Sequence, residues 1–182
     1  MLGLIFGSKQ ILSTCLLLLG ASTSLTFIYP LMNKYLSSFD LNNEEIGYIF
    51  STSNITYIST SILLTKKFSN VKKKYVLILG SILGILSTQL VSGENMIGFK
   101  AHWGFFLCGM LVLGVSHSLC VIPFIPEIRS LILEKFPEEK LVAGDISSTL
   151  FFSSYYCGKI LIVNFKASLE GLPFPGFYSI II

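Results

Sequence analysis

Two titratable side chains stand inside long apolar stretches of this sequence, and they are the first candidates for chemistry. His117 lies between Ser116 and Ser118. Lys159 follows Tyr155 by one helical turn. A histidine can exchange protons near neutral pH, whereas a lysine attracts anions and repels cations. Each also has a structural interpretation, His117 as a hydrogen-bonding group between helices and Lys159 as a side chain that extends its ammonium group to a membrane surface.

A stripe of hydroxyl groups runs through an apolar segment in the first third of the chain. Its members recur at the spacing of one helix face: Ser53, Thr56, Tyr57 and Thr60. Ile55, Ile58 and Ile62 would occupy the opposite face, toward lipid. Two interpretations stay open: the stripe lines a cavity that binds a polar solute, or it holds neighbouring helices together. On a face turned to lipid, the Ser and Thr hydroxyls of the stripe would lack partners.

The sequence contains no group of residues typical of an enzyme or a metal site. It has no Ser/His/Asp set, no paired carboxylates inside a span and no glycine-rich phosphate loop. Its four cysteines lie in apolar runs without CxxC spacing: Cys15, Cys108, Cys120 and Cys157. We therefore expect no catalytic residues, no metal and no cofactor. A net charge of +3 is too small to indicate a nucleic-acid partner.

The candidate residues must be positioned by helices that lie in a lipid bilayer. Apolar residues make up 52% of the 182 and charged residues 13%, against about 25% charged in an ordinary soluble domain. Five segments reach or approach the roughly 20 residues that a spanning helix needs: residues 11–32, 46–64, 76–91, 103–125 and 146–163. We expect an all-α, polytopic transmembrane helix bundle that forms one domain over residues 1–182, with residues 176–182 as the start of a truncated sixth span.

Basic residues fall mainly on one side of these five expected spans. That side holds the N-terminus and the loops at residues 65–75 and 126–140, with these basic residues: Lys9, Lys66, Lys67, Lys72, Lys73, Lys74, Arg129, Lys135 and Lys140. The other side holds only Lys34, Lys100 and Lys166. Because cytoplasmic loops carry the excess of lysine and arginine, we expect a multi-pass membrane protein with a cytoplasmic N-terminus.

A short amphipathic segment follows the fourth expected span. Pro123 and Pro126 end that span, because neither can donate a hydrogen bond to the helix. An apolar stripe opposite charged residues then predicts an interfacial helix over residues 127–136, steeply angled to the span; its members are Ile128, Leu131, Ile132 and Phe136. Glu127 and Arg129 could pair with cytoplasmic loop charges and latch one conformation, and simple anchoring at the interface is the alternative.

Four stretches of the chain resemble, in order, one half of a known transporter fold. They are FIYPLMNKYLSSFDLNNEEIGYIF (residues 27–50), YVLILGSILG (75–84) after the lysine-rich loop, VIPFIPEIRS (121–130) and GDISSTLFFSSYYCGKI (144–160). Together they resemble the C-terminal half of a major facilitator superfamily transporter, and are most similar to its vesicular amine and polyamine branch. The sequence departs from that pattern at Lys66 and Lys67, where the family has an acidic residue, and at Lys159, where a Gly-Pro pair is usual.

The resemblance implies that this chain supplies the seventh to eleventh helices and the start of the twelfth. Transport in such proteins takes place between two six-helix halves, so the chain should move a small organic solute with a matching six-helix half, or by self-association, and be inactive alone. Polar faces of the first, second, fourth and fifth spans should form one concave wall that includes Tyr57, His117 and Tyr155. An amine or polyamine is the solute class implied, although a cavity lysine would repel it. The alternative is a non-transporting membrane scaffold or partner subunit.

The expected topology can be tested by labelling a single introduced cysteine. A cysteine at Lys73 should react with a membrane-impermeant thiol reagent from the cytoplasmic side, because its loop carries most of the positive charge. Reaction from the opposite side would show that this orientation is wrong.

Overall fold

The computed structural model describes residues 8–36, 39, 41–67, 71–92 and 103–169. The regular elements of this part of the chain are α-helices, which confirms the all-α prediction. In chain order they are α2 (Lys9–Leu36), α3 (Asn43–Lys67), α4 (Lys73–Ser92), α5 (Trp103–Val121), α6 (Phe124–Lys135) and α7 (Lys140–Leu169). The expected sixth span at residues 176–182 lies outside the described residues.

Helices α2, α3 and α7 extend beyond the apolar segments from which they were predicted, to 28, 25 and 30 residues. At the start of α3 the reason is a capping box. The Asn42 backbone N–H donates to the Glu45 carboxylate at 2.9 Å, and the Glu45 N–H donates to the Asn42 side-chain oxygen at 2.9 Å. Residues 43–45, which precede the second expected span, therefore belong to the helix. Asp145, which directly precedes the fifth expected span, likewise lies five residues inside α7.

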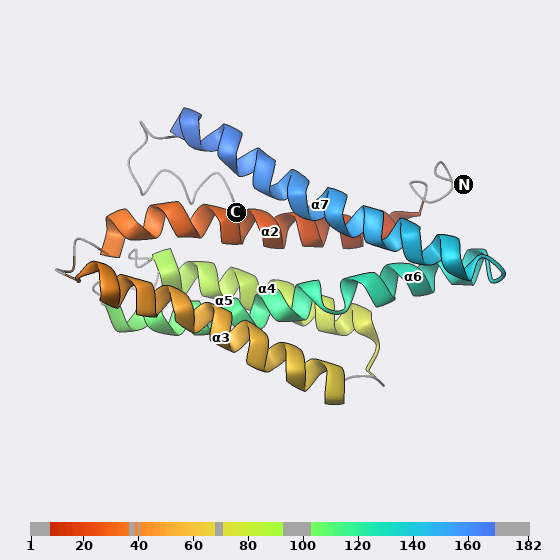
Figure 1. Cartoon of the computed structure of the whole chain (residues 1–182), viewed down its shortest axis with the longest axis horizontal. Coiled ribbons are helices and arrows are strands. Elements are labelled where there is room, and N and C mark those ends of the chain that lie inside the picture. The colour runs from red at the N-terminus through yellow and green to blue at the C-terminus, as the bar shows by residue number, and fades with distance from the viewer. Residues whose placement is uncertain (1–7, 37–38, 40, 68–70, 93–102, 170–182) are drawn as a thin grey trace.

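The helices pack as two groups. Helices α2 and α7 lie together, and α3, α4 and α5 form the second group, with α5 between the other two (Figure 1). Helix α6 connects the groups, since it follows α5 in the chain and packs against α7. The first and last described helices are thus direct neighbours, although more than a hundred residues separate them.

Each close helix pair meets at a glycine. A Cβ atom added to Gly114 of α5 would collide with the Ser53 carbonyl and the Thr56 hydroxyl of α3. One added to Gly158 of α7 would meet the Ser22 hydroxyl of α2, and one added to Gly80 of α4 would lie 2.8 Å from the sulfur of Cys120 in α5. The absence of a side chain at these positions lets the backbones approach closely, as is common between helices in membranes.

Hydroxyl groups form hydrogen bonds across the same helix pairs. The Ser116 hydroxyl of α5 donates to the Gly80 carbonyl of α4 at 2.7 Å. The hydroxyls of Ser61 in α3 and Ser118 in α5 are 3.1 Å apart. Between α2 and α7, the Thr23 hydroxyl donates to the Gly158 carbonyl at 3.4 Å, a weak contact. These bonds stabilise contacts within each group.

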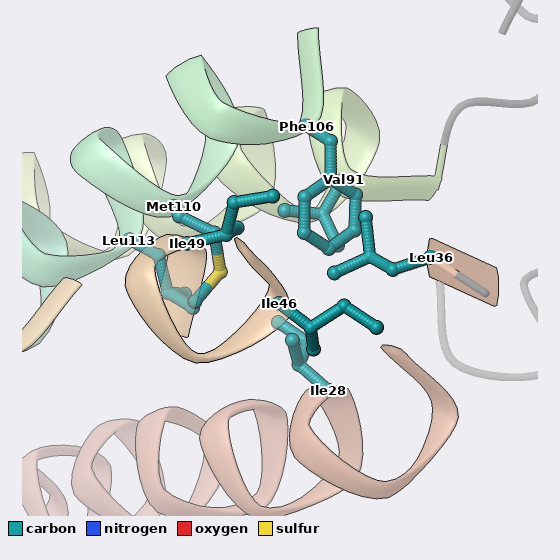
Figure 2. Close-up of a cluster of buried hydrophobic side chains, with 8 residues drawn as sticks. All are labelled: Ile28, Leu36, Ile46, Ile49, Val91, Phe106, Met110 and Leu113. Atoms are coloured by element: carbon teal, nitrogen blue, oxygen red, sulfur yellow. The ribbon is translucent and has the colours of Figure 1, made fainter. Parts of the chain in front are cut away.

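Two apolar clusters lie toward opposite ends of the bundle, and the first of them joins the two groups directly. The first cluster brings α2 against α3, α4 and α5 (Figure 2), and its members are Ile28, Leu36, Ile46, Ile49, Val91, Phe106, Met110 and Leu113. The second cluster brings α2 and α7 against α6, and its members are Ile11, Leu18, Phe124, Ile128, Ile132, Ala143 and Leu150. The middle of the bundle, between the two clusters, is where the polar side chains of α3, α5 and α7 meet.

The α-helix is interrupted by a turn at residues 122–123, so α5 and α6 are separate helices, as the prolines predict. Helix α6 nevertheless continues in the general direction of α5 instead of turning steeply away (Figure 1). Ile128 and Ile132 are 0% and 1% exposed because they belong to the second cluster. The apolar stripe that predicted an interfacial helix is therefore covered by protein, and packing on α2 and α7 holds α6 along the bundle.

Apolar side chains also cover the outside of the bundle. Ile55, Ile58 and Ile62 of α3 are 61%, 57% and 50% exposed, on the face that the sequence predicts. In the described part of the chain, two helical stretches are long and apolar enough to cross a membrane, by length and composition: Lys73–Val91 and Trp103–Lys135. The structure thus supports an association with a membrane.

The contact at Gly114 can be tested by one substitution with a matched control. Gly114→Ala should lower the free energy of unfolding by about 1–3 kcal/mol, because the new methyl group pushes α5 from the α3 backbone. Gly47→Ala makes the same change where nothing lies within 4 Å, on an exposed part of α3. There alanine should be neutral or stabilise the helix by about 1 kcal/mol. Thermal unfolding in detergent, followed by circular dichroism, measures both; equal effects would contradict the close contact.

Candidate functional site

A cavity of about 470 Å³ lies between the two helix groups. Residues of four helices line it: Leu25 and Thr26 of α2, Ser53, Asn54 and Tyr57 of α3, Gly114 and His117 of α5, and Tyr155 and Lys159 of α7. Leu25 also packs against the first apolar cluster and Tyr155 against the second. The cavity is therefore bounded by an apolar cluster toward each end of the bundle.

Five of the seven side chains predicted from the sequence come together in this cavity: Ser53, Tyr57, His117, Tyr155 and Lys159. They lie on α3, α5 and α7, and Leu25 and Thr26 of α2 complete the four helices whose polar faces were expected to converge. Their role toward a solute stays a prediction. What the structure establishes is that residues 57, 117 and 155, far apart in the sequence, form one surface.

Three of the nine lining residues carry aromatic rings, and these rings lie close together. The rings of Tyr57 and His117 have centroids 5.3 Å apart, and those of His117 and Tyr155 are 6.3 Å apart. Behind Tyr155, the ring of Phe151 is stacked at 5.8 Å with an interplanar angle of 7°. Because Phe151 packs against the second apolar cluster, the orientation of Tyr155 is supported from the side away from the cavity.

His117 faces the cavity while the residues beside it hold other helices. Ser116 bonds to α4 and Ser118 to α3, as described above. The Nδ1 atom of His117 is buried and has no hydrogen-bond partner among the described residues. The hydrogen bonds between helices are thus formed by Ser116 and Ser118 and not by His117. The imidazole is left available to a molecule in the cavity.

Lys159 lines the cavity. Helix α7 continues for ten residues beyond it, to Leu169, which is about 15 Å at the usual helical rise. The fifth expected span ends only four residues after Lys159, so the helix is longer than the sequence predicts, and extension of Lys159 to a membrane surface stays a prediction. In the structure the ammonium nitrogen lies 4.6 Å from the ring centroid of Tyr155 and 5.8 Å from that of Tyr156.

The aromatic contacts of Lys159 stabilise its ammonium group. A cation over an aromatic ring gains about 0.5–2 kcal/mol. No carboxylate lies among the lining residues. A charged side chain in a cavity without an anionic partner in the lining is a reason to look for a function.

Part of the hydroxyl stripe of α3 lines the cavity, and part of it contacts a neighbouring helix. Ser53 and Tyr57 line the cavity, whereas Thr56 contacts α5 at Gly114 and Thr60 is not part of the lining. The expectation that these hydroxyls need partners from outside is wrong for two of them. Ser53 donates to the Phe50 carbonyl at 2.9 Å, and Thr56 to the Thr52 carbonyl at 2.9 Å. Serine and threonine commonly satisfy themselves in this way inside helices.

The two residues proposed as a conformational latch lie outside the cavity. Glu127 is half-buried and Arg129 exposed on α6, and neither forms an ion pair with a described residue. The latch therefore stays a prediction.

Four lining residues were not predicted: Leu25, Thr26, Asn54 and Gly114. On α2 the sequence predicts a polar face without naming its residues. Asn54 directly follows Ser53 and lies off the spacing of the hydroxyl stripe. Gly114 has no side chain, and only its contact with α3 places the cavity beside it.

The cavity combines hydroxyl, amide, imidazole and ammonium groups with aromatic surface, a combination suited to binding a small organic molecule. Comparison with known proteins adds no family to this description: no protein-family model, curated protein or solved structure matches the chain.

The different roles of His117 and Ser116 predict opposite effects on stability. His117→Phe should leave the free energy of unfolding unchanged or raise it by about 1–3 kcal/mol, because it removes a buried polar atom that has no described partner. Ser116→Ala should lower it by about 1 kcal/mol, because the bond to the Gly80 carbonyl is lost. Thermal unfolding in detergent compares the two. A clear loss of stability in the His117 variant would show that the imidazole has a structural partner.

Proposed function

We propose that this chain is a membrane-spanning half of a secondary transporter for small organic solutes. In this proposal the five helices α2, α3, α4, α5 and α7 cross the bilayer, with the N-terminus and the loops around Lys73 and Lys135 in the cytoplasm. The chain acts as the C-terminal half of a major-facilitator-type transporter, together with a second six-helix unit, and has no catalytic activity of its own.

The observation that carries this proposal is the cavity. It lies at mid-length of the bundle and takes side chains from four helices that belong to two separately packed groups. Transporters place their solute sites at such a depth, between units that can move against each other. The polar lining among helices with apolar outer faces favours a solute site over a purely structural core.

Two further observations support a bundle that spans the membrane. Helices α2, α3 and α7 are each long enough to cross a hydrocarbon core of about 30 Å. Large aliphatic side chains are exposed along α3 and α4, which include Ile55, Ile58, Ile82 and Ile85. Such exposure is costly in water and favourable in lipid.

Uptake into liposomes tests the need for a second unit. The purified 182 residues, reconstituted alone, should give no saturable uptake of organic solutes with or without a proton gradient, because alternating access needs one unit to rock against another. Reconstitution with a matching six-helix unit should produce uptake. A Tyr57→Ala variant in the same pairing should reduce it, and Ile58→Ala, on the outer face next to it, should not.

The outcomes separate the proposal from its alternative. Robust uptake by the chain alone would overturn the assignment as a half and require a complete path within these helices. Stable association with a six-helix unit, but no uptake of any solute, would favour the scaffold or partner-subunit function instead.

A further inference from the structure

The charge in the cavity lining is positive only. Of its nine lining residues, Lys159 is the one that carries a full charge, and none is acidic. The lysine ammonium donates hydrogen bonds and cannot accept them, so a negative group is its natural partner. A positively charged solute in the same space would be repelled.

No carboxylate of the surrounding helices can reach Lys159. The described sequences of α2 and α5 contain no aspartate or glutamate. On α3 the carboxylates are Glu44 and Glu45, both in its first turn and about 18 Å along the helix from Tyr57. On α7 itself, Asp145 lies about 21 Å from Lys159 along the helix axis.

The ammonium group is held in place without being neutralised. Its contacts in the described part of the chain are with the faces of Tyr155 and Tyr156, at 4.6 and 5.8 Å. Aromatic faces attract a cation but carry no net charge. The negative charge that would complete the site is therefore not supplied by the helices that pack around it.

The other lining residues indicate what kind of molecule could carry the negative charge. Tyr57, His117 and Tyr155 offer ring surfaces on one side, and Leu25 adds an apolar side chain. Asn54 and Thr26 provide neutral hydrogen-bonding groups. These groups fit a small molecule with one anionic end and an apolar or aromatic body.

We propose that the cavity binds small organic monoanions, carboxylates with an aromatic or apolar body, through Lys159. This inference rests on the proposed function, since it names the solute class of the same site. It replaces the amines and polyamines that the sequence resemblance implies.

Three solutes of nearly equal shape and different charge test it: benzoate, benzyl alcohol and benzylamine. Their binding to the full chain is measured by saturation-transfer NMR and calorimetry in phosphatidylcholine nanodiscs, which contain no anionic lipid. Benzoate should bind about tenfold or more tightly than the other two, because it alone supplies the missing charge. A titration of the benzoate complex with sodium chloride shows whether an inorganic anion competes for the site.

Substitutions of the lysine provide the matched controls. Lys159→Met removes the charge but keeps most of the length of the side chain, and it should weaken benzoate binding about tenfold while leaving the binding of benzyl alcohol unchanged. Lys159→Arg keeps the charge and should retain most of the affinity for benzoate. The helix content of both variants is checked by circular dichroism, and the ranking of the three solutes by the unmodified chain tests the proposal even if a variant does not fold.

The failure of this inference differs from the failure of the proposed function. Equal binding of all three solutes, or tighter binding of benzylamine, would overturn the anion assignment and leave an organic-solute site in place. Binding of none of them would count against the solute site itself. Preference for benzoate that Lys159→Met does not change would overturn the role of Lys159.

Discussion

Close approach of helix backbones at glycine is the constraint on which the rest of this structure depends. Inside a bilayer, helices gain little from burying apolar side chains against each other, because lipid is equally apolar. Contact then depends on van der Waals packing and on hydrogen bonds over short distances. Gly80, Gly114 and Gly158 permit those distances, and each lies beside a serine or threonine hydroxyl of the neighbouring helix. These pairings decide which helices form a group.

The cavity lies between the two helix groups, where the described contacts include no glycine paired with a serine or threonine. The glycine contacts and the interhelical hydroxyl bonds described above lie within the α2–α7 pair or among α3, α4 and α5. The two groups meet through larger apolar side chains toward one end of the bundle, and toward the other end α6 packs on α2 and α7. Between those ends, bulky aromatic and basic side chains of α5 and α7 keep the groups apart, and the polar space remains. One arrangement of small and large residues therefore produces both the rigid groups and the site between them.

The sequence predicted the helices well and their contacts poorly. Hydropathy identified α2 to α5 and α7, because a long apolar run has few other structures open to it. The spacing of polar residues placed Ser53, Tyr57, His117, Tyr155 and Lys159 on surfaces that come together. The predicted orientation of α6 was wrong, because an amphipathic stripe has the same sequence pattern whether lipid or protein covers it. The position of Lys159 depended on the true end of α7, and element boundaries are the least certain part of sequence analysis.

The pairing of α2 with α7 has a consequence for how the protein is made. The contacts among α3, α4 and α5 described above join residues at most 61 positions apart in the sequence, Ser53 and Gly114, so this group can assemble as it leaves the ribosome. Of the described helices α2 is made first, yet its main partner begins 104 residues after α2 ends. At about 5–20 residues per second, α2 waits some 5–20 s with the small residues of its contact face, Ser22 and Thr23, unpacked. Among the described helix contacts, the one between α2 and α7 is therefore the last that can form.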